Sequence, residues 1–244
     1  MARAVDILVI VAEGPQTLGQ IAARAQLSKA TTHRLLAALG HRSLIIQDSG
    51  TGNYSLGPGC IALADAVVRG TGRMGVVARP YLTELSALTR ETVTMHVRVG
   101  TQRFCIDEVP SPHPIRFTSG IGVAEPIHTG SAGKILLAFA PAAVREQLLS
   151  SLKLVALTKN TIVDRRALDH ELEGIRAVGY AVSHGERVDG ASGVSVPIFD
   201  ADGVAMAALS ILGPSTRIDQ EPVETFLKPL GKYANEISVR MLQG

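Results

Sequence analysis

The sequence has little that would indicate a secreted, membrane-bound or nucleic-acid-coating protein. Only two of its 244 residues are cysteines, Cys60 and Cys105, which are far apart and form no disulfide framework. The net charge is only +2, so any contact with nucleic acid must be confined to a local surface. The apolar run within MARAVDILVIVAEG is too short to span a bilayer, and no small-residue cleavage site of a signal peptide follows it. These absences predict a soluble cytoplasmic protein with no membrane partner.

The sequence also lacks the motifs of metal-dependent and nucleophilic catalysis. Its histidines include no pair four residues apart, which argues against a zinc site. The stretch 129-TGSAGK-134 departs from the Walker pattern, which would need Gly at His128 and Ser or Thr at Ile135. It also departs from a nucleophile elbow, because a threonine stands at the first glycine position. The neighbours Asp107 and Glu108 would point to opposite faces of a strand, so we do not expect them to act as an acid–base pair. We predict no enzyme activity, no metal and no other cofactor.

What the sequence does contain is enough apolar material for a core, since hydrophobic residues make up 46% and charged residues 19%. The N-terminal region predicts a helix over residues 4–12, ended by Gly14-Pro15. A second helix is expected after Thr17, which has Gln20 at capping-box spacing. A tight turn then leads to Ser28, the expected N-cap of a third helix that ends at Gly40. A hairpin follows, with strands over 44–46 and 54–56 around a Gly-rich loop.

Two short helices joined by a tight turn are typical of a helix-turn-helix, and the hairpin would form its wing. Ala30 and Thr31 are small enough to allow close approach to base edges, while Ser28 and Thr32 suit phosphate oxygens. The alternative is an ordinary solvated helix face, but the cap, turn, partner helix and wing together favour DNA binding. The predicted DNA contacts are Thr17, Ser28, Lys29, Ala30, Thr31, Thr32, His33, Arg34, Thr51 and Asn53.

The remaining chain predicts a second region that mixes strands and helices. A helix over 60–69 and a joint at Gly70-Thr71-Gly72 lead into it. Helices are expected over 74–89, 131–139, 142–149, 165–178 (capped by Asp164) and 220–241. Strands are expected over 92–99, 103–109, 115–118, 180–182, 193–199 and 204–212, the last two joined by a turn at 200–203. This mixture indicates the α+β class with a mainly antiparallel sheet.

The start of the helix expected over 131–139 is rich in small residues, so its backbone N–H groups could face an anion. A helix start that is small only for packing is the alternative.

The run 17-TLGQIAARAQLSKATTHRLLAALGHRSLIIQDSGTGNYSLGPGCIALADA-66 resembles the winged helix of IclR-type transcriptional regulators. Further markers are 91-ETVTMHVRVGTQRFCIDEVPSPHPIRF-117, 127-IHTGSAGKILLAF-139, 178-VGYAV-182, 197-PIFDADG-203 and 206-MAALSILGP-214. The resemblance spans residues 3–242. It implies a winged helix-turn-helix over 1–58, a linker helix over 59–72 and a GAF-like effector-binding and oligomerisation domain over 73–244. It also implies a homodimer, often a dimer of dimers, that reads a pseudo-palindromic double-stranded DNA operator.

The resemblance further implies a pocket for a small-molecule effector. Carried over residue by residue, it assigns backbone contacts to Gly130, Ser131 and Ala132 and side-chain contacts to Glu186 and Ser210.

Two positions depart from the family pattern. Gly193 stands where many members have cysteine, and Leu212 where many have a second serine. Because polar groups and volume are lost, we expect a roomier and more apolar pocket, suited to an aromatic or branched organic acid. Met95, Phe117 and Leu212 are predicted wall residues, with ordinary core packing as the alternative for each.

The resulting hypothesis is a sequence-specific transcriptional regulator, with a repressor preferred, that responds to a small organic acid. Ligand binding would shift the dimer geometry and so the separation of the two recognition helices. The rivals are a DNA-binding dimer that senses nothing and an enzyme acting on a small organic acid.

Overall fold

A computed structural model describes residues 2–67 and 73–243. The chain divides into two compact units, one within residues 1–72 and the other within 73–244. The helix expected over 60–69 is α4, Gly59–Val67, and the expected joint Gly70-Thr71-Gly72 lies outside the described residues. No helix in the described ranges is both long enough and apolar enough to cross a membrane.

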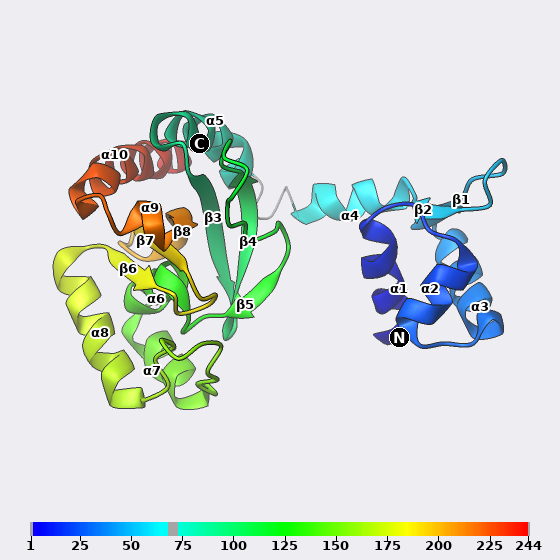
Figure 1. The fold of residues 1–244 in the computed structure, drawn as a ribbon, viewed down its shortest axis with the longest axis horizontal. Coiled ribbons are helices and arrows are strands. Elements are labelled where there is room, and N and C mark those ends of the chain that lie inside the picture. The colour runs from blue at the N-terminus through cyan, green and yellow to red at the C-terminus, as the bar shows by residue number, and fades with distance from the viewer. Residues whose placement is uncertain (1, 68–72, 244) are drawn as a thin grey trace. The chain divides into compact units, whose positions relative to one another are not determined.

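The first unit is built from short helices and one hairpin (Figure 1). Its elements are α1 (Ala2–Ala12), α2 (Leu18–Ala25), α3 (Lys29–Gly40), β1 (Ile45–Gln47), β2 (Tyr54–Leu56) and α4. The predicted caps are confirmed, because Thr17 and Gln20 form the capping box of α2 and the Ser28 side chain accepts from the Thr31 N–H. The predicted end of α3 at Gly40 is also confirmed. A small core holds the unit together, with Ile7, Val11, Ile21, Leu36 and Ile45 among its buried members.

The second unit contains an antiparallel sheet, six-stranded among the described residues, in the order β5-β4-β3-β8-β7-β6 (Figure 1). This confirms the predicted fold class. The strands are β3 (Thr92–Val99), β4 (Gln102–Val109), β5 (Ala124–Pro126), β6 (Ala181–His184), β7 (Ala191–Phe199) and β8 (Ala205–Pro214). The helices are α5 (Arg73–Thr89), α6 (Gly130–Ala138), α7 (Ala142–Ser151), α8 (Arg165–Val178), α9 (Ser215–Ile218) and α10 (Val223–Leu242).

The two faces of this sheet bury different residues, because successive side chains of a strand alternate between faces. One face is apolar and packs against α5 and α10, with Val93, Met95, Val194, Leu209 and Ile211 in the shared core. The other face is covered by α6, outside which α7 and α8 complete a second apolar core (Figure 1). Thr94, His96, Ser195 and Ser210 are buried on this second face.

One predicted strand was wrong. Residues 115–118 form no strand, and the short strand beside β4 is instead β5. The carbonyl of Ile115 accepts from the Arg217 guanidinium, and that of Phe117 accepts from the Thr92 hydroxyl at 2.7 Å. Side chains therefore supply the hydrogen bonds that these two carbonyls would receive from a neighbouring strand in a sheet. The short helix α9 was not predicted.

Candidate functional site

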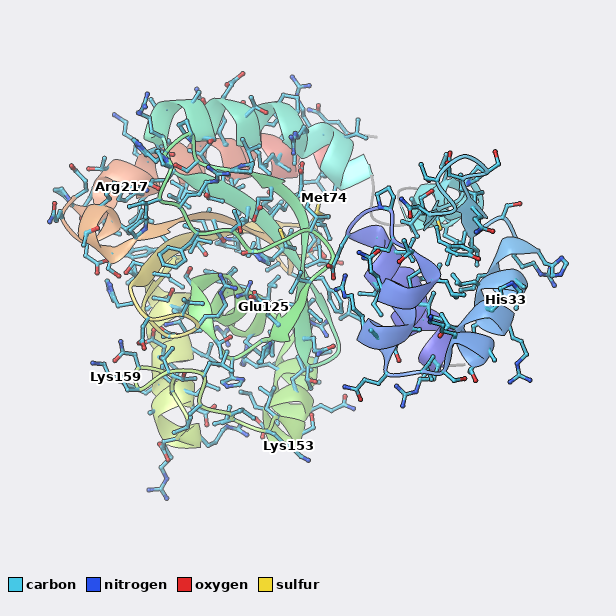
Figure 2. The ribbon with its side chains drawn as sticks, turned by 45° about the vertical axis from the view of Figure 1, so that its right-hand side comes forward. His33, Met74, Glu125, Lys153, Lys159 and Arg217 are labelled. Carbon is cyan, nitrogen blue, oxygen red and sulfur yellow. The ribbon has the colours of Figure 1, made fainter. Side chains whose placement is uncertain are left out.

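The first candidate surface is the exposed side of α3 in the first unit. Ser28, Lys29, Ala30, His33 and Arg34 are all exposed, and Figure 2 shows the His33 side chain directed away from the helix into solvent. The N-terminal N–H groups of a helix attract phosphate, and the first residues of α3 are exposed. The predicted recognition face is thus available to a DNA groove.

One predicted contact is wrong. Thr32 is 0% exposed, and its hydroxyl donates to the Ser28 carbonyl at 3.0 Å. It belongs to the core between α3 and its neighbours, because position 32 lies one turn before the buried Leu36. Thr31 is half-buried and its hydroxyl accepts from that of Ser28 at 2.9 Å, so it remains near the surface.

The predicted DNA contacts outside α3 also hold the local structure of the first unit. Thr17 is exposed, with its hydroxyl engaged in the capping box of α2. At the tip of the wing, Asp48 accepts from the Thr51 N–H at 2.7 Å and from the Thr51 hydroxyl at 2.8 Å, bonds that lower the pKa of Asp48. The half-buried Asn53 donates its N–H to that same hydroxyl. These contacts shape the wing. Two further exposed basic residues, His41 and Arg42, directly follow α3 and were not predicted.

The second candidate site is a cavity of about 40 Å³ in the second unit, between the sheet and the start of α6. It brings together most of the predicted effector contacts from elements far apart in the sequence. These are Gly130, Ser131, Ala132, Glu186, Gly193, Ser210 and Leu212.

Met95 and Phe117 were wrongly predicted as wall residues. Met95 is fully buried on the opposite face of the sheet, in the core under α5 and α10. Its neighbours Thr94 and His96 line the cavity instead, as the alternation of a strand requires. Phe117 is half-buried outside the cavity lining and contributes its carbonyl to Thr92.

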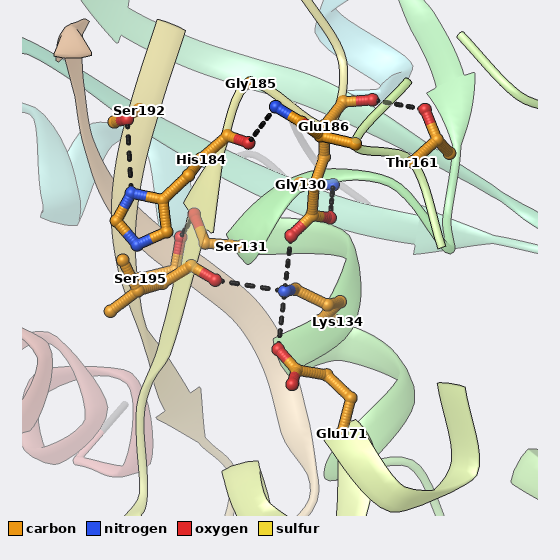
Figure 3. A network of polar contacts seen from close by, with 12 residues as sticks. Gly130, Ser131, Lys134, Thr161, Glu171, His184, Gly185, Glu186, Ser192 and Ser195 are labelled. Carbon is orange, nitrogen blue, oxygen red and sulfur yellow. Dashed lines mark hydrogen bonds and ion pairs between the residues drawn. The ribbon is translucent and has the colours of Figure 1, made fainter. Parts of the chain in front are cut away.

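A network of buried charged groups lies at the N-terminal end of α6 (Figure 3). The Lys134 ammonium, 1% exposed, donates to Glu186 and to Glu171 at 2.6 Å each and to the Val182 carbonyl at 3.0 Å. The other oxygen of Glu186 accepts from the Gly130 N–H at 3.0 Å. Glu186 therefore occupies the place of an anion at the first N–H of the helix.

The remaining N-terminal N–H groups of α6 are not capped by the residue before the helix. Thr129 turns its hydroxyl to the Pro126 carbonyl at 2.9 Å. The N–H groups in the first turn of a helix have no acceptors within the helix, and Ser131 and Ala132 of this turn line the cavity.

A chain of serine hydroxyls forms the floor. Ser195 of β7 donates to Ser131 at 2.7 Å and lies 2.6 Å from the hydroxyl of Ser210 on β8. A Cβ built on Gly193 would stand 3.1 Å from the Ser131 hydroxyl and 3.3 Å from the Ile211 carbonyl. The expectation of a roomier pocket was therefore wrong, because Ser131 fills the space next to Gly193.

The expectation of a more apolar pocket was also wrong. Arg103 and Arg187 line the cavity, and both form ion pairs with the buried Glu125, the Arg103 pair at 2.5 Å. Burial lowers the pKa of Arg103 to about 10, with Glu125 acting in the opposite direction, so the guanidinium stays charged at neutral pH. A Cβ on Gly130 would lie 3.6 Å from Nη2 of Arg103, which places this charge beside the start of α6.

His96 completes the lining and is 2% exposed. Burial, and after it the charges of Arg103 and Arg187, hold the pKa of His96 well below its usual range, so the ring is neutral. Thr94, His96, Arg103, Ser183 and Arg187 were missed by sequence reasoning, although the alternation of Thr92, Thr94 and His96 along one strand was a usable signal. The donors of this lining could pair with an acid group. Ser192 also lines the cavity, and its hydroxyl lies 3.5 Å from Nδ1 of His184, a long contact, while that same nitrogen lies 3.1 Å from Asp219. Within the described ranges, no group of three His, Cys, Asp or Glu side chains could hold a metal.

Comparison with known proteins assigns a family to both units. The family description "IclR helix-turn-helix domain" matches residues 1–49, and "Bacterial transcriptional regulator IclR C-terminal" matches residues 72–239. The HTH-type transcriptional regulator BhcR of Paracoccus denitrificans is 32% identical over 98% of this chain and 86% of its own length. The HTH-type transcriptional repressor AllR of Escherichia coli K12 is 32% identical over 85% of this chain and 76% of its own length.

Solved structures give the same result. The IclR protein of Thermotoga maritima has a TM-score of 0.83 at 28% identity, covering 98% of this chain and 97% of its own. An IclR homologue from Microbacterium hydrocarbonoxydans, complexed with 4-hydroxybenzoate, has a TM-score of 0.80 at 28% identity, with coverages of 98% and 97%. The relatives are named regulators rather than enzymes, and the resemblance seen in the sequence is confirmed: this chain belongs to the IclR family of transcriptional regulators, with a helix-turn-helix that binds DNA and a C-terminal domain that binds an effector.

Proposed function

We propose that this protein is a repressor that binds a pseudo-palindromic operator as a homodimer, or a dimer of dimers, and is controlled by a small organic acid. The repressor role is supported by the name of the AllR relative. The linker segment 59–72, of which residues 68–72 lie outside the described ranges, is proposed to join the operator-binding domain, 1–58, to the effector domain, 73–244. A DNA-reading role also favours the cytoplasmic location expected from the sequence.

The organic acid is proposed from one observation above all: the start of α6 and the buried Arg103 converge on one cavity. Helix N–H groups and a guanidinium are both donors suited to a carboxylate. The 4-hydroxybenzoate complex of a relative shows that this fold can hold an aromatic acid in that protein. The cavity is small, about 40 Å³, so compact aliphatic acids should be tested beside aromatic ones.

The predicted DNA face supplies the second half of the proposal. Each recognition helix of a dimer must meet its major groove about one helical turn from its twin. An effector that binds one dimer geometry better than another therefore changes operator affinity by its differential binding energy.

Fluorescence anisotropy with the DNA upstream of the protein's own gene tests the DNA half. We expect saturable binding that weakens with salt, and a scrambled duplex of equal length should bind far less tightly. The variant Lys29→Ala plus Arg34→Ala should lose affinity at every salt concentration. The exposed pair Lys153→Ala plus Lys159→Ala removes the same charge from the second unit and is the matched control (Figure 2). Equal affinity for the scrambled duplex would refute sequence-specific binding.

The same anisotropy assay tests effector control. Adding acids to the preformed complex should release DNA, or tighten it, only where the acid also raises the melting temperature of the protein by mass action. A panel of organic acids that leaves both the anisotropy and the melting temperature unchanged would favour a DNA-binding dimer that senses nothing.

A further inference from the structure

His96 is a buried polar side chain without a partner. It lies on β3, lines the cavity and is 2% exposed. Neither Nδ1 nor Nε2 has a hydrogen-bond partner in the described part of the chain. Buried polar groups in native proteins are nearly always hydrogen-bonded, so an unpaired imidazole facing a cavity indicates a group that enters the cavity.

The residues around His96 determine which hydrogen-bonding groups the ligand must carry. Arg103 on β4 and Arg187 in the loop after β6 are the charges that act on His96, and both are cationic. Their carboxylate partner, Glu125 on β5, is held by the two guanidiniums. The nearest residues across the β3–β8 ladder are Ala208 opposite His96 and Ser210 opposite Thr94, neither of them charged. The ring is thus a neutral imidazole, with one nitrogen donating and the other accepting.

A hydroxyl group matches this pair of requirements, because it both donates and accepts a hydrogen bond. A methyl or aromatic C–H satisfies neither nitrogen, and a carboxylate cannot donate. Arg103 offers a second unpaired donor in the cavity lining, since its Nε also has no hydrogen-bond partner among the described residues. A hydroxyl close to both would accept from Arg103 or His96 and donate to His96.

We propose that His96 is a specificity-determining residue that recognises a hydroxyl on the effector, so that the protein selects hydroxy acids over the matching acids without the hydroxyl. This inference rests on the proposed organic-acid function, with the carboxylate at the start of α6. Selection of this kind is strong because an analogue that lacks the hydroxyl leaves the buried imidazole unpaired.

Isothermal titration calorimetry with three matched pairs of acids tests the inference: glycolate and acetate, lactate and propionate, 4-hydroxybenzoate and benzoate. For at least one pair, we expect the hydroxy acid to bind the full-length protein at least tenfold more tightly, about 1.4 kcal/mol. His96→Leu should abolish the preference chiefly by weakening the hydroxy acid, whereas His96→Gln, which keeps a donor and an acceptor, should restore part of it. Met95→Leu changes the neighbouring residue on the other face of β3 and should leave the preference unchanged.

The outcomes separate this inference from the function on which it rests. If none of the six acids binds the wild-type protein, the organic-acid proposal fails and the inference fails with it. If acids bind but hydroxy acids show no preference, only the inference fails, whatever the variants do. A preference that survives in His96→Leu would show that another group recognises the hydroxyl.

Discussion

Lys134→Met is the substitution whose cost the structure predicts most directly. The ammonium is 1% exposed and joins Glu186, 8% exposed, to Glu171, 38% exposed. Methionine has a similar length and no charge, so the substitution removes the cation while leaving the packing of α6 nearly filled.

The loss in the free energy of unfolding depends on the hydrogen-bond partners that Glu171 and Glu186 keep when the cation is removed. Glu171 can turn to water, so its loss counts for little. Glu186 keeps the Gly130 N–H at 3.0 Å but otherwise becomes a buried charge without its cation. Removing one partner of a buried ion pair costs about 3–5 kcal/mol, and the remaining N–H bond places this case at the lower end, about 3 kcal/mol. For a unit of this size, that lowers the melting temperature by about 6–12 °C.

Thermal unfolding followed by tyrosine fluorescence measures this cost, since the chain has no tryptophan and Tyr81, Tyr180 and Tyr233 all lie in the second unit. Lys134→Met plus Glu186→Gln removes the stranded charge as well, so we expect it to recover part of the loss. The exposed Lys153→Met should change the free energy of unfolding by less than about 0.5 kcal/mol. A loss below about 1 kcal/mol for Lys134→Met, with no recovery in the double variant, would refute the argument.

Gly133→Ala should prevent the second unit from folding, because a Cβ there would lie 2.1 Å from the Ile127 carbonyl oxygen; circular dichroism that matches wild type would contradict this. His96 is neutral when folded but takes up a proton near pH 6.5 when unfolded, so stability should fall below that pH by up to about 1.4 kcal/mol per unit. Urea unfolding at pH 7.5 and 5.5 should show this dependence, and an equal one in His96→Gln would exclude His96 as its source. Ser28→Ala should cost the first unit about 1 kcal/mol, and an unchanged urea midpoint would show that the cap is dispensable.

The parts of the fold that could be predicted from the sequence are those set by contacts between close neighbours. The caps at Thr17, Ser28 and Asp164 each accept from an N–H three residues later, so the sequence alone contains both partners. The end of α8 is also set locally, because Gly179 follows the helix with a φ of +84°, a conformation that glycine commonly adopts at a helix end.

Long-range contacts decided the parts that could not be predicted. Residues 115–118 alternate in a way that favours a strand, yet Arg217, about a hundred positions away, takes the Ile115 carbonyl. The ion pairs at and near the cavity also depend on long-range contacts. Arg103 meets Glu125, and Lys134 meets Glu186, only once the sheet and α6 are assembled. No local pattern in the sequence pairs them.

Strand β3 shows where the residue-level reasoning about the pocket went wrong. An alternating strand is usually interpreted as one buried apolar face and one solvated polar face. In β3 both faces are buried: Val93 and Met95 pack under α5 and α10, while Thr94 and His96 lie under α6. A polar face costs free energy when it is covered, unless its groups find partners. The unpaired nitrogens of His96 are therefore better explained by a ligand that supplies the partner than by packing. On this reasoning, the polar residues of a covered strand face, rather than its apolar ones, are the candidates for the proposed effector site.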